Sequence, residues 1–313
     1  MELAKKQILL ISPRGFCAGV TRAIDVVLET LKKYGPPVYV KHEIVHNKHV
    51  IEDLKSKGTI FIEDLKDAPN DRPLIFSAHG VSKEIVKQAQ NKNAIIIDAT
   101  CPLVTKVHIQ AEKFFKKGYK IVLIGHKDHP EVEGTMGQLP QGSIILVESI
   151  VDVDKLNFGT GDSLAYITQT TLSVDDTDEI INKLIEKYPN IQSSPKEDIC
   201  YATTNRQNAI KAFSNKCDAF IVVGSKNSSN SNRLVEVAIN SGCENSRLLE
   251  NVDQLNLDEY EDSSIIGISS GASVPDQLVH AVIRKFKKNF NVNVEISIYG
   301  EEKISFKLPK ELR

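Results

Sequence analysis

The stretch AIIIDATCPLVTKVHIQAEKFFKKGYKIVLIG, residues 94–125, contains the pattern that decides the fold. It begins with an apolar run at 94–97, which is followed by a polar turn that carries Cys101. Apolar residues then recur at helical spacing over 103–115 and stop before a glycine. A second apolar run occupies 120–124. The stretch therefore predicts a strand, a cysteine-bearing turn, a helix and a second strand.

The same pattern accompanies two other cysteines, Cys17 and Cys200, although the strand signal before Cys200 is weak. In each copy the second strand ends in a polar loop, and a third apolar run leads to another polar loop. A serine follows each of these later loops in a position that predicts a helix cap. These serines are Ser82, Ser173 and Ser273. The chain is therefore predicted to be built from a threefold internal repeat.

Strands that alternate with helices form parallel sheets with right-handed crossovers. The three repeats are predicted at 13–100, 101–196 and 197–288. Strand 7–12 is expected to join the third repeat, and the tail, 289–313, is expected to form a strand or an extended arm. The predicted fold class is α/β, with three similar units of parallel sheet around a pseudo-threefold axis.

The cysteine turns and polar loops follow the carboxyl ends of the predicted strands, where α/β proteins bind ligands. Three units around one axis would bring Cys17, Cys101 and Cys200 together. A helix N-terminus favours the thiolate, and thiolates bind soft metals. These cysteines therefore predict a metal centre with one open position, either zinc or a four-iron cluster. Cys217 and Cys243 are interpreted as buried core residues.

Hydrogen-bond donors are frequent in the remaining positions of these loops. They are His46, His79, Ser228, Asn230 and Ser273. Donors near helix N-termini hold phosphate groups, and the sequence contains no nucleotide-binding fingerprint, so the loops indicate a small phosphate ester. Glu131 is a candidate proton donor, because a carboxylic acid in a dry pocket can retain its proton.

The bulk composition excludes several classes of protein. Among 313 residues there are 39 Lys and Arg against 41 Asp and Glu, so the basic excess expected of a nucleic-acid-binding protein is absent. No apolar run approaches the roughly 18 residues that span a bilayer, and no secretion signal is recognisable. Five cysteines without a C-x-x-C pair argue against a disulfide framework. We therefore expect a cytoplasmic protein that binds neither nucleic acid nor membrane.

Nine ordered motifs resemble those of the 4-hydroxy-3-methylbut-2-enyl diphosphate reductases, which complete the methylerythritol phosphate route to isoprenoids. They include PRGFCAGV at 13–20, DATCPLV at 98–104, HPEVEG at 129–134, ICYATTNRQ at 199–207 and GSKNSSNSNR at 224–233. The resemblance runs from residue 8 into the tail.

The resemblance implies a 4Fe–4S cluster that is held by Cys17, Cys101 and Cys200 and whose open fourth iron acts as a Lewis acid on the substrate hydroxyl. It implies that the polar loops bind the diphosphate, through His46, His79, His129, Ser228, Ser229, Asn230 and Ser273. Glu131 would be the proton source, with Thr170 and His129 in the catalytic network. Two electrons, from a ferredoxin or flavodoxin, and two protons would yield isopentenyl and dimethylallyl diphosphate plus water.

Two functions of other classes are also compatible with three cysteines around an open metal position. A non-redox iron–sulfur dehydratase would use the open iron only as a Lewis acid, and it would work without a reductant. A cluster-based redox sensor would have no turnover, and it would not need a set of donors suited to a diphosphate.

Overall fold

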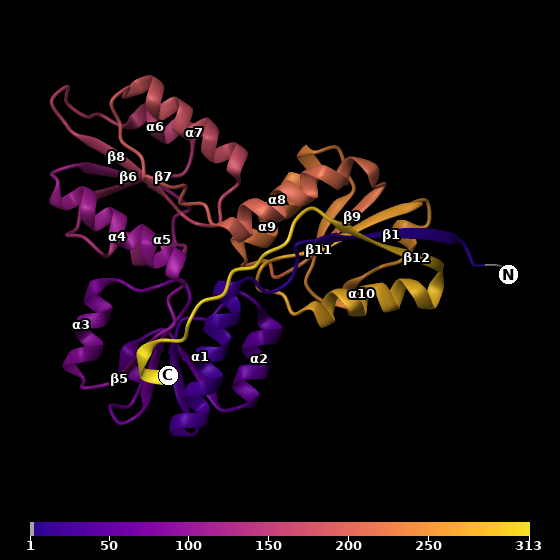
Figure 1. Cartoon of the computed structure of the whole chain (residues 1–313), viewed down its shortest axis with the longest axis horizontal. Helices are drawn as coiled ribbons and strands as arrows, with labels where there is room; N and C mark the ends of the chain where they lie inside the picture. Colours follow the sequence, from indigo (N-terminus) through magenta and orange to yellow (C-terminus); the bar gives the residue numbers. More distant parts are fainter. Residues whose placement is uncertain (1–2) are drawn as a thin grey trace. The chain divides into compact units, whose positions relative to one another are not determined.

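The structure is a computed structural model that describes residues 3–313, and it is an α/β fold with three parallel sheets (Figure 1). The chain divides into two compact units. Unit 1 consists of the residues up to Ala18, His46–Val50 and Tyr201–Ile304. Unit 2 consists of Gly19–Val45, Ile51–Cys200 and Ser305–Arg313. The predicted fold class, α/β with three parallel sheets, is confirmed.

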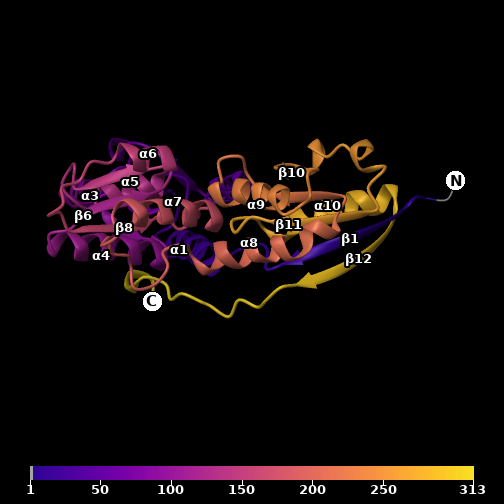
Figure 2. The ribbon, with the colours of Figure 1, turned by 90° about the horizontal axis from the view of Figure 1, so that it is seen from above.

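Unit 1 contains a five-stranded sheet of order β10-β9-β11-β1-β12, in which every neighbouring pair is parallel. Its strands are β1 (Lys5–Ser12), β9 (Ala219–Val223), β10 (Ser246–Leu249), β11 (Ile265–Ser270) and β12 (Asn291–Ile298). β1 lies between β11 and β12, as Figure 2 shows. The N-terminal strand and the strand of the tail thus complete a sheet whose other strands come from residues 219–270.

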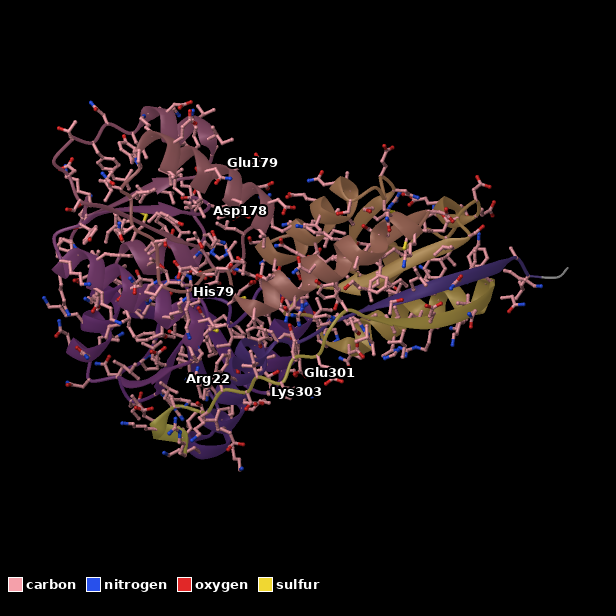
Figure 3. The ribbon with its side chains drawn as sticks, turned by 45° about the horizontal axis from the view of Figure 1, so that its top comes forward. Arg22, His79, Asp178, Glu179, Glu301 and Lys303 are labelled. Atoms are coloured by element: carbon pink, nitrogen blue, oxygen red, sulfur yellow. The ribbon has the colours of Figure 1, made fainter. Side chains whose placement is uncertain are left out.

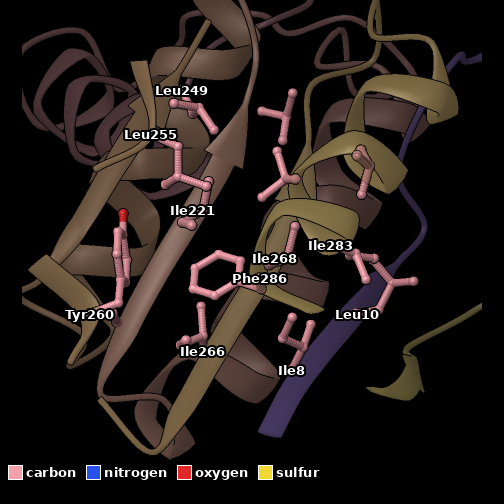
Figure 4. Close-up of a cluster of buried hydrophobic side chains, with 14 of the residues drawn as sticks. Ile8, Leu10, Ile221, Leu249, Leu255, Tyr260, Ile266, Ile268, Ile283 and Phe286 are labelled. Atoms are coloured by element: carbon pink, nitrogen blue, oxygen red, sulfur yellow. The ribbon is translucent and has the colours of Figure 1, made fainter. Parts of the chain in front are cut away.

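Helices cover both faces of this sheet: α8 (Tyr201–Phe213), α9 (Ser229–Asn240) and α10 (Asp276–Asn289). Ile8 and Leu10 of β1 pack with Phe286 of α10 in one buried cluster (Figure 4). Leu9 and Ile11 point to the opposite face and pack with apolar residues of α8 and α9. Successive side chains of a strand alternate between faces, so a sheet that is covered twice requires a continuous apolar run. That requirement explains the apolar sequence of β1.

Unit 2 contains two smaller parallel sheets, of order β3-β2-β4-β5 and β7-β6-β8. Their strands are β2 (Val38–Lys41), β3 (Thr59–Ile62), β4 (Pro73–Phe76), β5 (Ile95–Asp98), β6 (Lys120–Ile124), β7 (Ile144–Val147) and β8 (Leu164–Thr168). The α-helices before Cys200 are α1 (Ala18–Tyr34), α2 (Lys48–Ser56), α3 (Lys83–Asn91), α4 (Pro102–Lys116), α5 (Pro130–Met136), α6 (Ile150–Lys155) and α7 (Val174–Lys187). No helix within residues 3–313 is both long and apolar enough to cross a membrane.

The three sheets share one strand order. The positions of β3-β2-β4-β5 correspond to β7-β6-β8 and to β10-β9-β11-β1, and β12 adds an outer strand to the last sheet. The fourth position of the second sheet holds only an isolated bridge between Ala165 and Gln192, which lies before Cys200 where the strand signal is weak. The strand that precedes a cysteine therefore pairs within the sheet of the preceding repeat. The proposed repeat boundaries and the pseudo-threefold axis remain predictions.

Candidate functional site

Each of the three repeat cysteines stands directly before a helix. Cys17 precedes α1, Cys101 is the N-cap residue of α4, and Cys200 precedes α8. None of the three forms a disulfide, and all three are partly exposed. Each thiol lies near the positive end of a helix dipole, so the position of these side chains suits metal ligands.

One backbone hydrogen bond recurs at all three cysteines. The amide N–H of the cysteine donates to a carbonyl oxygen in the loop that follows the third strand of a repeat. The pairs are Cys17–Ala272 at 3.1 Å, Cys101–Ala78 at 2.9 Å and Cys200–Thr170 at 3.0 Å. The acceptors follow β11, β4 and β8 at the same distance along the chain. The internal similarity therefore extends to the hydrogen bonds that hold the cysteine turns.

The other two cysteines have a different environment. Cys217 and Cys243 are buried in the apolar cluster that includes residues of α8 and α9. Burial raises the pKa of the Cys217 thiol to about 12, and burial also raises the pKa of Cys243. A thiol in such surroundings stays protonated and is chemically inert. The interpretation of these two residues as core cysteines is confirmed.

Glu131 is a carboxyl group that the fold takes out of water. It lies in the first turn of α5 and is only 3% exposed. Its Oε1 accepts the amide N–H of Thr170 at 2.7 Å, and its Oε2 accepts the Thr170 hydroxyl at 2.9 Å. Burial raises the pKa of Glu131 to about 7, against the opposing effect of both hydrogen bonds from Thr170. Near neutral pH the carboxyl group is therefore protonated in about half of the molecules.

Thr170 links this acid to a cysteine turn. Its side chain and amide N–H contact Glu131, while its carbonyl oxygen accepts the amide N–H of Cys200 at 3.0 Å. All three residues belong to unit 2. The fold thus brings together a candidate proton donor, a hydroxyl group and a candidate metal ligand through direct hydrogen bonds.

Two predicted ligand-binding histidines lie in the same unit as Glu131. The rings of His79 and His129 contact each other edge to face, with centroids 5.9 Å apart. His129 is the N-cap residue of α5, and its Nδ1 accepts the amide N–H of Glu131 at 3.1 Å. Because Nδ1 is the acceptor, the neutral ring carries its proton on Nε2 and can donate from that atom. This is the role expected of a phosphate-binding histidine.

In unit 1 the predicted phosphate-binding residues gather at the start of α9. Ser228 is the N-cap residue of this helix, and Ser229 is its first residue. Ser273 donates its hydroxyl to the carbonyl oxygen of His46 at 3.0 Å. Asn230 is 6% exposed, and both its amide oxygen and its amide nitrogen are buried without a hydrogen-bond partner among the described residues. A buried amide left in this way is costly, and a polar ligand would satisfy it.

The prediction that Ser273 caps a helix is wrong. The N-cap residue of α10 is Pro275, and no side chain forms a capping hydrogen bond at this helix start. The residue before a proline avoids the helical conformation, so the helix cannot begin until Pro275 has passed. The equivalent predictions for Ser82 and Ser173 are confirmed, since their hydroxyls accept helix amide N–H groups at 3.3 Å and 3.2 Å.

Sequence reasoning missed several polar residues that surround the cysteine turns. They are Arg22, Lys106, Asp198 and Arg206. Asp198 is an example: it is buried, accepts the amide N–H of Thr168 at 3.3 Å and lies 3.2 Å from the ammonium group of Lys106. The sequence offered only a weak signal for these residues. Of the four, only Asp198 and Arg206 lie in or beside the ICYATTNRQ motif.

The predicted metal ligands are divided between the units, with Cys17 in unit 1 and Cys101 and Cys200 in unit 2. Within residues 3–313, no three His, Cys, Asp or Glu side chains form a ready metal site. The donor chemistry nonetheless fits an iron–sulfur cluster, because three partly exposed thiols at helix N-termini are soft ligands in equivalent settings.

Comparisons with known proteins identify relatives along nearly the whole chain. The family model described as LytB protein matches residues 8–287. A 4-hydroxy-3-methylbut-2-enyl diphosphate reductase of Beijerinckia indica is 52% identical over 99% of this chain and 97% of its own. The reductase of the same name from Ruegeria pomeroyi is 51% identical over 97% and 96%.

One solved structure is similar throughout its length. It is the E-1-hydroxy-2-methyl-but-2-enyl-4-diphosphate reductase of Plasmodium falciparum, with a TM-score of 0.94 and 44% sequence identity. The match covers 100% of this chain and 97% of that one.

Proposed function

The chain belongs to the LytB protein family, and we propose that it reduces 4-hydroxy-3-methylbut-2-enyl diphosphate to isopentenyl and dimethylallyl diphosphate. The reaction removes an allylic hydroxyl group as water, and it therefore needs a proton donor beside the leaving oxygen. The buried pair of Glu131 and Thr170 is the observation that carries this proposal. Relatives that are about half identical across nearly the whole chain are reductases of this substrate.

We propose that Cys17, Cys101 and Cys200 hold a 4Fe–4S cluster at the centre of the three repeats. The equivalent amide hydrogen bonds of the three turns and the partial exposure of the three thiols support this assignment. When bound, a cluster with three cysteine ligands would supply electrons and leave one iron open as a Lewis acid for the allylic hydroxyl. The expected source of these electrons is a ferredoxin or a flavodoxin.

The proposed diphosphate ligands are the polar loop residues that the sequence predicted. They are His46, His79, His129, Ser228, Ser229, Asn230 and Ser273. The start of α9 offers amide N–H groups and the positive end of a helix dipole, which favour phosphate oxygens. The buried amide of Asn230 gains the partner that it lacks when a polar ligand binds there. His129 donates from Nε2, because Nδ1 is held by the amide of Glu131.

Glu131 is the proposed source of the proton that leaves with the hydroxyl group. When its Oε2 is protonated, this atom donates to Thr170 Oγ1, and the Thr170 hydroxyl proton is then free to point elsewhere. Thr170 would direct this proton to the substrate oxygen. In the balanced reaction two electrons and two protons enter, the allylic C–O bond breaks, one proton leaves in the water and the other is bound by an allylic carbon.

Anaerobic turnover with and without a reductant tests the proposal against its rivals. The purified chain is incubated with the substrate and dithionite, or with the substrate alone, and the five-carbon products are quantified. We expect products only with the reductant, at two electrons per product. The same protein after removal of iron is the control and should be inactive. Conversion without a reductant would favour a dehydratase, and no conversion in either reaction would favour a sensor.

A further inference from the structure

Three cations link the cysteine turns in a cyclic order along the chain. Each cation stands on the helix that follows one cysteine, and each contacts the backbone that precedes the next cysteine. The cations are Arg22 of α1, Lys106 of α4 and Arg206 of α8. None of these contacts is local in sequence, so the order is a property of the fold.

Arg22 follows Cys17 in the sequence, and its side chain binds the backbone just before Cys101. Its guanidinium group is buried, and it donates to the carbonyl oxygen of Thr100 at 3.1 Å and to that of Asp98 at 3.4 Å. The same group donates to the carbonyl oxygen of Lys307 at 2.8 Å. Lys307 belongs to the C-terminal segment, which passes the labelled Arg22 in Figure 3. Thr100 immediately precedes the cysteine, so the contact restrains the first peptide group of its turn.

Lys106 follows Cys101 in the sequence, and its side chain binds the backbone just before Cys200. Its ammonium group donates to the carbonyl oxygens of Lys196 and Glu197, at 3.1 Å and 2.5 Å. It also forms an ion pair of 3.2 Å with the buried carboxylate of Asp198. Three successive residues just before the cysteine are therefore bound to one side chain of the preceding repeat.

Arg206 follows Cys200 in the sequence, and its side chain binds the backbone just before Cys17. This third contact completes the cyclic order. It is 0% exposed, and its Nη2 donates to the carbonyl oxygen of Gly15 at 2.8 Å. Its Nη1 pairs with the carboxylate of Glu302 at 2.9 Å and also donates to the carbonyl oxygen of Ala202, in the first turn of its own helix, at 2.9 Å. Burial of a guanidinium group is costly unless the group is paired and hydrogen-bonded. Arg206 is therefore expected to keep these partners in the folded protein.

We propose that Arg22, Lys106 and Arg206 are positioning residues, each of which fixes the turn of the next cysteine. The inference rests on the proposed function, because it concerns the turns whose cysteines would hold the cluster. A charged group that binds backbone carbonyls restrains the chain without competing for the thiol. Loss of one cation should loosen one turn and make the iron easier to remove.

Lys106 offers the cleanest test, because it is only partly buried and its replacement should not prevent folding. Lys106→Met is compared with Lys113→Met, a change at an exposed position on the same helix. Amide hydrogen exchange is measured on the full chain, purified without oxygen. In Lys106→Met the amide of Cys200 should exchange roughly tenfold faster or more, as expected for a lost charged contact. The amide of Cys101, at the start of the same helix, should be unaffected, and Lys113→Met should change neither.

The other two cations extend the pattern. Arg22→Met should accelerate exchange at Cys101 and leave Cys17 unchanged. Arg206 is fully buried, so the conservative Arg206→Lys is used instead of a methionine variant. It should accelerate exchange at Cys17 alone. Equal acceleration at all three cysteines, or acceleration at the turn of the same helix, would overturn the proposal because it would indicate general destabilisation.

Iron release separates this inference from the proposed function. Transfer of iron to a chelator should be about tenfold faster from Lys106→Met than from Lys113→Met. The predicted exchange pattern in a protein that never binds iron would support the positioning contacts and refute the cluster. An active, iron-loaded protein with unchanged exchange and iron release in Lys106→Met would refute the positioning and leave the reductase intact.

Discussion

Replacement of Glu131 by glutamine removes a proton donor while it preserves the shape of the side chain. The glutamine oxygen can accept the Thr170 amide N–H that is now 2.7 Å from Oε1. Its NH2 group can donate to the Thr170 hydroxyl oxygen, which is now 2.9 Å from Oε2. The cysteine turns are untouched, so Glu131→Gln should fold, bind iron and bind the substrate. Only proton transfer should suffer.

The size of the expected loss follows from the burial of the carboxyl group. A glutamic acid with the ordinary pKa of 4.5 is protonated in roughly one molecule in 300 at pH 7, whereas a pKa of about 7 leaves about half of the molecules protonated. General acid catalysis contributes about 10²–10⁴-fold to the rate. Turnover of Glu131→Gln should therefore fall by at least about a hundredfold, with little change in the binding of diphosphate.

The pH profile identifies the group responsible. Wild-type turnover should decline as the pH rises through about 7, because the carboxyl group then loses the proton that it must donate. The residual activity of Glu131→Gln should lack this decline. Anaerobic rates measured from about pH 6 to about pH 9 decide the matter. Wild-type rates in the variant, or an unchanged decline with pH, would refute the assignment of Glu131 as the acid.

The same substitution should change stability in the opposite direction. A carboxyl group whose pKa is raised on folding stabilises the folded state most at low pH, and this contribution is lost as the pH rises from 4.5 through about 7. At pH 8 the folded wild type therefore holds a buried carboxylate, and Glu131→Gln should be more stable by up to about 3 kcal/mol. At about pH 4 the two proteins should unfold alike. Thermal unfolding of the iron-free proteins, with equal midpoints at both pH values, would contradict this reasoning.

Three further substitutions have defined outcomes. Thr170→Val removes the hydroxyl group that would direct the proton to the substrate, so turnover should fall about tenfold, and it removes a hydrogen bond that lowers the pKa of Glu131, so the decline should move to higher pH in the rate profile. Asn230→Leu should weaken the binding of inorganic diphosphate about tenfold in calorimetry, yet raise the thermal midpoint of the ligand-free protein by removing a buried amide without a partner. Phe286→Ala should lower the free energy of unfolding by about 3–5 kcal/mol in denaturant titrations without loss of iron, because this fully buried ring lies in the apolar cluster of unit 1.

Features that depend on local sequence could be predicted well. The apolar run before Cys17 forms β1, and the alternating residues of the tail form β12. The pattern located both strands but not every buried face, since Ile296 and Ile298 of β12 are exposed and Ser297 between them is buried. The burial of Cys217 and Cys243 was likewise predicted, because a lone cysteine is usually a small buried apolar residue.

Features that depend on distant contacts could not be predicted. The segment before Cys200 has a single bridge in place of a strand, and Asp198 and Lys106 are separated along the chain by three helices and three strands. The burial that raises the pKa of Glu131 is also a tertiary effect, since the HPEVEG motif contains nothing apolar enough to exclude water by itself. Repeat position directed attention to Glu131, but the three positioning cations have no comparable local signal.

The most direct test of the account measures iron, sulfide and visible absorption in anaerobically purified Cys101→Ser and Cys217→Ser. The two residues share their chemistry but not their setting, because Cys101 is partly exposed at a helix N-terminus and Cys217 is buried in the core. A hydroxyl group is a poor ligand for a soft metal at neutral pH. We expect Cys101→Ser to lose most of its iron and brown colour and Cys217→Ser to keep both. Retention of the cluster in Cys101→Ser together with its loss in Cys217→Ser would contradict the account.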